Sequence, residues 1–343
     1  MFVSIGLRIL ANVEAFNAVE TVGNVTKHRR APMVVPTKTG YKLIYVPAVS
    51  GEAIANAFQR NLVLASKQIY SREGIKPPLT VWDERFEFVK FMDRAHLTSE
   101  LRKIVESKAD VATKKHEFEK VAIKTSVVAD VGGFLYAEED LPVKRTSRIQ
   151  TGYMLPTYDS LESVAIEAQF HARHVPAEAG AGGERAAQMI YYVEVASALY
   201  GMTINLDIDG IGKTSLVKIE DAVDKDEKVR RVKASLSALA GLFITSGFGA
   251  KLSRFAPVKS IESAVATVSD NIAFTVTPPQ IPTYIEDTVR RANEAVNTLK
   301  NLGIDTAINV ITYSRTKIEK AKNVATIEEL FKELTDIVLR KLK

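Results

Sequence analysis

FVSIGLRILA, residues 2–11, alternates large apolar side chains with small or polar ones. A period of two is typical of a β-strand, because successive side chains of a strand point to opposite faces of the sheet. Val3 and Leu7 would then face a hydrophobic core, whereas Ser4 and Arg8 would lie on an opposite face that is small, polar and basic. The segment therefore predicts a strand at the start of a folded domain rather than a secretion signal.

Further strands and helices are predicted outward from this segment. Residues 12–36 are polar and rich in turn residues, with a turn at Gly23 and Asn24. Strands are expected at 41–46, 122–135, 164–170, 189–195, 201–208 and 306–313, and helices after a Ser50 cap and at 81–105, 226–245, 284–302 and 327–341. Their irregular alternation predicts an α+β protein. No long linker divides the chain, so we expect one elaborated domain over 1–343, with a helical insertion at about 60–120.

Composition limits the classes of protein that remain. Of the 343 residues, 46% are hydrophobic, so the chain can bury a large core. It contains no cysteine, which excludes disulfides and thiolate chemistry and fits a reducing compartment. No segment approaches the roughly 20 apolar residues that span a bilayer. We therefore expect a cytoplasmic protein with no membrane partner.

Basic residues gather in three clusters, although the net charge is only +5. Each cluster has few acidic residues nearby and lies next to Gly, Pro or Ser. One such cluster is as often a solvated surface as a binding site, but three together favour contact with a polyanion. The clusters are Lys27, Arg29 and Arg30 beside His28; Lys144, Arg145 and Arg148; and Lys251, Arg254 and Lys259.

Two glycine-containing segments invite comparison with phosphate-binding loops. GIGKT at 210–214 lacks the first glycine of the P-loop pattern, because Asp207 stands there, and a carboxylate would repel phosphate. We therefore predict a hairpin turn. SGFGAKLSRF at 246–255 follows a predicted helix, and its glycines would let backbone N–H groups approach a phosphate. A simple helix end explains the same glycines equally well.

No catalytic or metal-binding motif is recognisable. The histidines are His28, His96, His116, His171 and His174, and their spacing does not indicate a zinc site. His28 and His171 can be interpreted as the general acid and base of an RNA-cleaving site, or as residues that contact phosphate or fill polar pockets. The sequence shows no carboxylate that would orient either ring. We therefore expect no metal, no cofactor and no enzymatic activity.

Six blocks of sequence, taken in order, resemble one known family. The set resembles the DevR-type backbone subunit of archaeal type I-A Cascade, a CRISPR interference complex, within the RAMP superfamily. The resemblance covers residues from about 2 to 258, and the C-terminal helices match less distinctively. The blocks are VEAFNAVETVGNVTKHRRAPMVV, YVPAVSGEAIANAFQ, DVGGFLYAEEDLPVKRTSRIQTGYMLP, EAQFHARH, VEVASALYG and SGFGAKLSRFAP.

The resemblance implies a modified RRM-like, ferredoxin-like core with helical insertions. Such subunits polymerise head to tail along the spacer of CRISPR RNA, beside other Cascade subunits, and hold the guide for pairing with target DNA. A guide holder must accept any spacer, so contact through the phosphate backbone suits this role. The alternative within the superfamily is an endoribonuclease that processes CRISPR repeat RNA through His28 or His171. A scaffold that binds no RNA would leave the three basic clusters unexplained.

The resemblance also assigns RNA-binding positions. Residues 174–188 are rich in Ala and Gly without a hydrophobic period, so a mobile loop is expected there, in the place of the family's thumb. GFG at 247–249 is shorter than the superfamily's glycine run, which weakens the expectation for that loop. The assigned residues are Asn17, Gly23, Asn24, Lys27, His28 and Arg29 in a first loop; Ser50 and Gly51 at a helix start; Lys144, Arg145, Ser147 and Arg148 in a basic block; His171 before the thumb; and Gly247, Gly249, Lys251 and Arg254 in the glycine loop.

Overall fold

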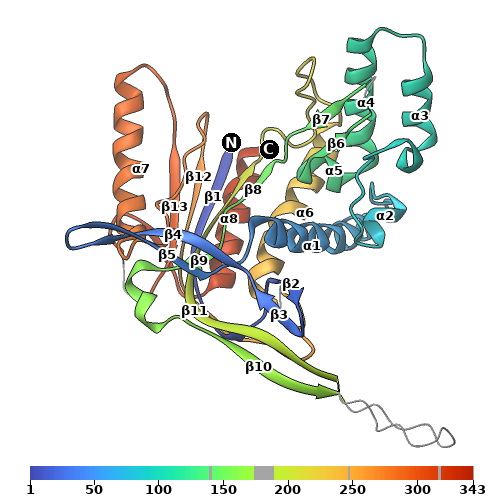
Figure 1. The fold of residues 1–343 in the computed structure, drawn as a ribbon. Helices are drawn as coiled ribbons and strands as arrows, with labels where there is room; N and C mark the ends of the chain where they lie inside the picture. Colours follow the sequence, from blue (N-terminus) through green and yellow to red (C-terminus); the bar gives the residue numbers. More distant parts are fainter. Residues whose placement is uncertain (139–140, 174–188, 246–247, 316–317, 343) are drawn as a thin grey trace, which may run out of the picture.

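The predicted first strand lies in the middle of the main sheet. The computed structural model describes residues 1–138, 141–173, 189–245, 248–315 and 318–342, and within these ranges the main sheet has ten strands. β1 (Phe2–Glu14) pairs antiparallel with β11 (Met189–Asp207) on one side and β12 (Val258–Ser269) on the other (Figure 1). The remaining strands are β13 (Ile308–Tyr313) and β14 (Lys322–Val324) beyond β12, and β3 (Val25–His28), β2 (Ala18–Val22), β8 (Ile149–Thr151), β9 (Leu155–Pro156) and β10 (Ala165–Arg173) on the β11 side.

Three helices pack on the apolar face of β1. Val3, Ile5 and Leu7 are fully buried there, as their alternation predicted. They share one core with Ile54 and Leu239 from the helices. The helices are α1 (Gly51–Arg72), α6 (Lys225–Ile244) and α8 (Ile327–Leu342). No helix in the described ranges is long and apolar enough to cross a membrane.

The order of elements in the core is regular. Along the chain it runs β1, α1, β8, β11, α6, β12, and across the sheet the strands lie in the order β12, β1, β11, β8. Every neighbouring pair in this set is antiparallel. The chain is thus a mixed α+β protein whose two core helices, α1 and α6, lie on one face of the sheet.

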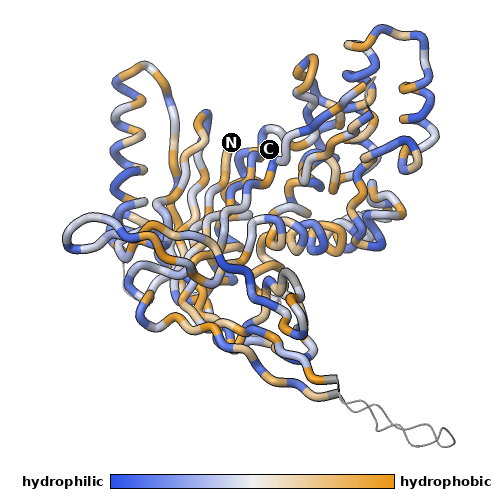
Figure 2. The backbone as a smooth tube through the Cα atoms, in the orientation of Figure 1, coloured by the Kyte–Doolittle hydropathy of each residue, from blue (hydrophilic) through white to orange (hydrophobic). Residues whose placement is uncertain are grey.

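The opposite face of β1 is also covered, which the sequence pattern did not predict. The segment between β12 and α7 (Tyr284–Asn301) crosses it, so that a Cβ on Gly6 would lie 3.0 Å from the Pro279 ring. Arg8 donates from Nε to the carbonyl oxygen of Pro279 at 2.9 Å. Figure 2 shows hydrophilic and hydrophobic residues alternating along α7, as expected of a helix with one buried side. Ser4 and Arg8 are therefore buried polar residues, not a free basic face.

A helical insertion follows α1 and begins later than predicted. α1 itself belongs to the layer on the sheet, so the insertion's own helices start at Val81. The strand predicted at 122–135 is wrong, because α4 and α5 extend as far as Gly132. Val127 to Val131 are all buried, so this run has no period of two that would indicate a strand. The elements are α2 (Val81–Glu84), η1 (Arg94–His96), α3 (Ser99–Glu106), α4 (Val111–Thr125), α5 (Val127–Gly132), β6 (Phe134–Tyr136) and β7 (Val143–Arg145).

Residues 12–36 form strands where a polar loop was expected. The predicted turn at Gly23 is confirmed, with φ of 62°, and it joins β2 to β3. β4 (Arg30–Thr37) and β5 (Gly40–Pro47) make a separate two-stranded hairpin that projects from the body of the molecule (Figure 1). A short 3₁₀ helix, η2 (Tyr158–Ser163), packs beneath it.

Candidate nucleic-acid interface

The first loop and the start of α1 are joined by hydrogen bonds. The Ser50 hydroxyl caps α1, and the Ser50 N–H donates to Oδ1 of Asn17 at 2.8 Å. The carbonyl oxygen of Asn17 accepts from the N–H of Arg29 at 3.0 Å. Gly51 lies so close to Thr151 that a Cβ would stand 2.4 Å from the carbonyl oxygen of Thr151. Four of the predicted residues therefore meet at a helix N-terminus, whose dipole favours an anion.

The glycine loop lies beside this helix start. Gly249 has φ of 141°, and a Cβ there would stand 2.7 Å from the Phe16 ring. Ala250 N donates to the carbonyl oxygen of Phe16 at 3.2 Å, and the rings of Phe16 and Phe248 pack with centroids 5.0 Å apart. The close approach requires glycine at position 249. Gly247 lies outside the described residues.

A groove of about 400 Å³ separates α1 from the glycine loop. Its far end carries Arg60, whose guanidinium lies over the Phe86 ring at 4.7 Å from the centroid. The sequence analysis did not identify Arg60, although its spacing from Ala53 and Ala57 places the three on one face of a helix. The lining residues are Phe16, Ala53, Asn56, Ala57, Arg60, Phe248, Gly249 and Leu252.

The first basic cluster spans the edge of the same region. Lys27 is exposed, Arg29 is half-buried, and exposed Arg30 lies 3.3 Å from a carboxylate oxygen of Glu194. The carbonyl of Asn24 accepts from the backbone N–H of Tyr192 on β11 at 2.8 Å, which attaches the β2–β3 turn to the main sheet. Lys27 is thus the member of this cluster that is most open to an external phosphate.

His28, by contrast, is buried. Its Nε2 lies 2.8 Å from Glu14 Oε1 and its Nδ1 lies 2.8 Å from the carbonyl oxygen of Arg29. Both partners are acceptors, so the ring donates from both nitrogens as an imidazolium. Burial alone would lower the pKa of His28, but the hydrogen bond and charge of Glu14 outweigh it and raise the pKa above 6.5. The Tyr200 hydroxyl also donates to Glu14, at 2.7 Å. Neither ring nitrogen is open to RNA, so the predicted direct contact is corrected to a structural ion pair.

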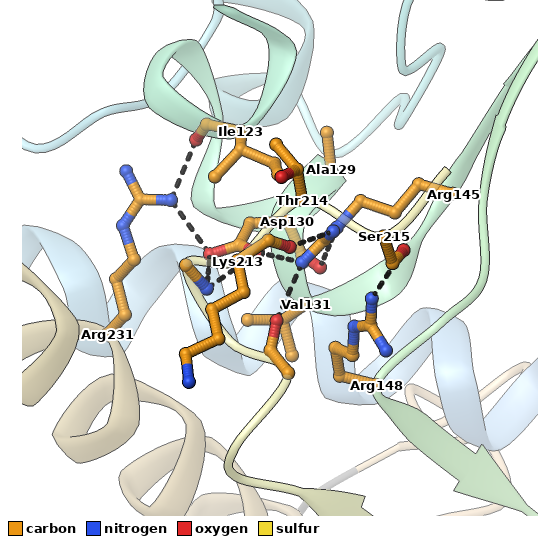
Figure 3. Close-up of polar contacts among 12 residues, drawn as sticks. Ile123, Ala129, Asp130, Val131, Arg145, Arg148, Lys213, Thr214, Ser215 and Arg231 are labelled. Atoms are coloured by element: carbon orange, nitrogen blue, oxygen red, sulfur yellow. Dashed lines mark hydrogen bonds and ion pairs between the residues drawn. The ribbon is translucent and has the colours of Figure 1, made fainter. Parts of the chain in front are cut away.

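Arg145 in the second basic cluster is likewise internal (Figure 3). Its side chain has no exposure and donates to Asp130 at 2.5 Å and to Glu119 at 3.1 Å. Arg231 from α6 donates to the other oxygen of Asp130 at 2.8 Å. Because the Arg145 guanidinium is enclosed by these carboxylates and by the carbonyl of Gly210, we correct its predicted contact with RNA. Arg145 joins the insertion to the core.

The same carboxylates hold the GIGKT segment. The N–H of Gly212 donates to Asp130 at 3.0 Å, and the N–H groups of Ser215 and Leu216 donate to Glu119 at 3.0 and 2.9 Å. The segment forms a turn, as predicted, and an antiparallel bridge follows between Lys213 and Asp221. The amides of Lys213 and Thr214 donate to the backbone carbonyls of Gly210 and Glu220, so the amides that would face a phosphate in a P-loop already have partners within the protein.

The remaining members of the second cluster differ in exposure. Lys144 on β7 is exposed. Arg148 is partly buried and donates to Asp207 at 3.2 Å and to Ser215 at 3.0 Å. The Ser147 hydroxyl donates to the carbonyl of Ile149 at 2.7 Å. Lys144 is therefore the side chain of this block that is open to a phosphate without loss of an existing contact.

His171 and Arg254 of the third cluster meet near the end of β10 and the start of β11. The His171 ring stacks on Tyr191 at 5.2 Å between centroids and meets the edge of Phe255 at 5.5 Å. Arg254 donates to the Tyr191 hydroxyl. Burial, and then the nearby charge of Arg254, lower the pKa of Lys251 below its usual value. The expected thumb, residues 174–188, lies outside the described residues.

The structure places the predicted residues at several points along β11. The β2–β3 turn contacts β11 at Tyr192, through Asn24. The start of α1 lies farther along the strand, because Gly51 packs against Thr151, which pairs with Ile204. The basic block lies at the end of the strand, where the carbonyl of Arg148 accepts from the N–H of Asp207. Within the described ranges, no three side chains of the kinds that bind metals lie together.

Comparison with known proteins agrees with this arrangement. A solved chain of a "CRISPR RNA-guided surveillance complex, pre-nicking" shares the fold, with a TM-score of 0.51, 13% identity and coverage of 98% of this chain and 99% of that chain. In sequence, the chain is 39% identical to the "CRISPR-associated aCascade subunit Cas7/Csa2 2" of Saccharolobus solfataricus over 87% of this chain and 88% of that protein. It is 27% identical to the "CRISPR-associated protein Cas7/Cst2/DevR" of Methanocaldococcus jannaschii over 98% and 99%.

A model of one protein family matches most of the length of the chain. The model described as "CRISPR-associated negative auto-regulator DevR/Csa2" matches residues 5–289, which include the whole of the α1 groove and both ends of β11. The ordered blocks of the sequence, the fold and the relatives therefore agree, and the chain belongs to the DevR/Csa2 family of CRISPR-associated proteins, the type I Cascade subunits of the Cas7 kind.

Proposed function

We propose that this protein is a backbone subunit that binds CRISPR RNA and polymerises along its spacer in a Cascade complex. The observation that carries the proposal is the groove at the start of α1. There one face of α1 from Ala53 to Arg60 and the glycine loop line one cavity, which begins just after the Ser50 cap. Backbone N–H groups and one cation bind a phosphate without reading a base. Lys27 and Lys144 supply further contacts at the two ends of β11.

The core topology supports the RRM-like part of this proposal. Two helices on one face of an antiparallel sheet with the order β12, β1, β11, β8 correspond to the ferredoxin-like arrangement. We propose that the other Cascade subunits, and target DNA paired with the guide, are its partners. The protein would assemble head to tail, because a subunit that repeats along RNA uses two different surfaces.

A role without catalysis is part of the proposal. An endoribonuclease would need a histidine that reaches the RNA. Glu14 does orient His28, which the sequence could not show, but both nitrogens of the ring already have partners. The observation therefore favours an RNA holder over a ribonuclease that uses His28.

Incubation of the purified protein with labelled repeat–spacer RNA tests the proposal. We expect retention of intact RNA and no new fragments. Arg60→Ala should weaken binding by roughly ten-fold, the loss of a charge-assisted contact of about 1.5 kcal/mol. Arg290→Ala, which removes an exposed arginine on α7, is the matched control. Defined cleavage would establish the ribonuclease instead, and failure to retain RNA would refute both functions.

A further inference from the structure

The β4–β5 hairpin has an exposed apolar face. Val34 and Leu43 are paired directly across the hairpin, as are Pro36 and Tyr41, so their side chains share one face. Tyr45, opposite Pro32, extends this face. Exposed fractions are 81% for Tyr41, 70% for Tyr45 and 56% for both Val34 and Leu43. An apolar patch of this extent on one element marks an interaction surface.

The inner face of the hairpin keeps it in place. Met33, Val35 and Val46 are buried, and they pack against Leu155 and neighbouring apolar residues of η2. A rigid ribbon loses little conformational entropy when a partner covers its outer face. Two exposed tyrosines on such a surface are typical of residues that dominate binding energy.

The charge of the hairpin restricts the kind of surface that can bind it. Residues 30–47 contain three basic residues and no acidic residue. Lys38 is exposed in the turn at the tip of the hairpin, whereas Lys42 pairs with Val35 and lies on the inner face. The complementary surface is therefore apolar with acidic residues around it. RNA lacks the aliphatic surface that would cover Val34, Leu43 and the prolines, so a protein surface fits better.

One surface with these properties lies on this chain itself. In the segment between β11 and α6, Val217 and Ile219 are exposed by 48% and 78%, and Asp221 is exposed as well. Residues 214–226 contain four acidic and two basic residues. Lys120 of α4 contacts Glu220, so the segment lies against the insertion, far from the projecting hairpin (Figure 1).

We propose that the outer face of the β4–β5 hairpin docks on residues 217–221 of a second copy of this chain. The inference rests on the proposed function and names the two surfaces through which copies would assemble. Apolar residues meet apolar residues, and Lys38 at the tip of the hairpin lies near Asp221 of the neighbouring copy. Because the two surfaces are different and lie at separate ends of the molecule, the contact repeats without closing and generates a helical array.

Cross-linking tests the contact directly, because the chain contains no cysteine. Leu43→Cys and Ile219→Cys are introduced together, the protein is assembled on a long guide RNA, and a short bis-maleimide is added. We expect covalent multimers from the double variant and none from either single variant. An equal mixture of the two single variants should give dimers only. Dimers from Leu43→Cys alone would show a symmetric contact and would overturn the proposal.

A second set of variants separates this inference from the proposed function. Leu43→Ser with Tyr45→Ser should bind an RNA too short for a second copy within two-fold of the wild type. On long RNA, each further copy of the same variant should bind with an affinity at least ten-fold lower than that of a wild-type copy. Leu302→Ser, which alters an exposed leucine on a different part of the surface, should change neither value.

Charge reversal provides the reciprocal test. Lys38→Glu should weaken assembly on long RNA, and addition of Asp221→Lys should restore it. Normal assembly of the hairpin variant, or absence of 43–219 cross-links on fully loaded RNA, would refute the docking surface and leave RNA binding intact. Failure of the wild type to bind the short RNA would instead refute the proposed function.

Discussion

At the scale of single residues, exposure separates side chains that look alike in the sequence. Lys144 and Arg145 are adjacent and equally basic, yet Lys144 is exposed whereas Arg145 is enclosed by Asp130 and Glu119. A buried cation with two carboxylate partners holds elements together, whereas an exposed one is open to a ligand. The two positions therefore predict opposite consequences of substitution.

Replacement of Arg145 by Met should lower the free energy of unfolding by about 3–5 kcal/mol, because two buried carboxylates lose a cationic partner that they share. Lys144→Met, the adjacent control, should change stability by less than about 0.5 kcal/mol and should weaken RNA binding. Urea unfolding and RNA titration measure the two effects. An Arg145→Met protein with unchanged stability would contradict the assignment.

The ion pair of His28 and Glu14 predicts a dependence of stability on pH. The folded-state pKa of His28 lies above its ordinary value of 6.5. The pair therefore contributes fully below pH 6.5, and the contribution is lost as the pH rises through the folded-state pKa. Glu14→Gln should lower the free energy of unfolding by about 3 kcal/mol near pH 6, and this difference should shrink as the pH rises. A difference that is constant from pH 6 to 9 would show that His28 is neutral.

At the scale of elements, the start of α1 combines two roles that can be separated. The Ser50 hydroxyl caps the helix at 3.3 Å from Ala53 N, and Thr98 caps α3 in the insertion at the same distance from Leu101 N. Ser50→Ala and Thr98→Ala should each cost about 1 kcal/mol of stability, the usual value of an N-cap.

RNA binding should distinguish these two caps. Ser50→Ala should also weaken RNA binding, because the hydroxyl cap fixes the first turn of α1, where Ala53 lines the groove. Thr98→Ala should leave RNA affinity unchanged, because α3 lies in the insertion, away from the groove residues. Equal losses of affinity in both variants would show that stability alone is being measured.

At the scale of the whole molecule, backbone contact predicts how affinity depends on salt and sequence. If each copy neutralises several phosphates, the logarithm of the affinity should fall linearly with the logarithm of the salt concentration, with a slope of about −0.7 per phosphate on single-stranded RNA. Two guides with unrelated spacers should bind within a few-fold of each other. A strong preference for one spacer would contradict a guide holder.

Local patterns determined a large part of the fold. The strand at 2–11, the helices α6, α7 and α8, and the Gly23 turn follow from periodicity, caps and glycine, which depend only on neighbours in the chain. The predicted strand at 122–135 was wrong because a fully buried apolar run has no period from which a helix can be distinguished. The family, too, could be identified from the ordered blocks of sequence.

Only the tertiary structure decided which of the basic residues are available. Glu14, which orients His28, lies fourteen residues before it in the chain. Arg231, which contacts Asp130, lies 101 residues after it. Burial and ion pairing are long-range properties, and the same Lys or Arg in the same local context is compatible with either outcome. The sequence by itself therefore determined many of the elements, the class and the family. The packing of β1, α1 and the insertion decided that Arg145 and His28 stabilise the protein while Lys27, Lys144 and the α1 groove remain open.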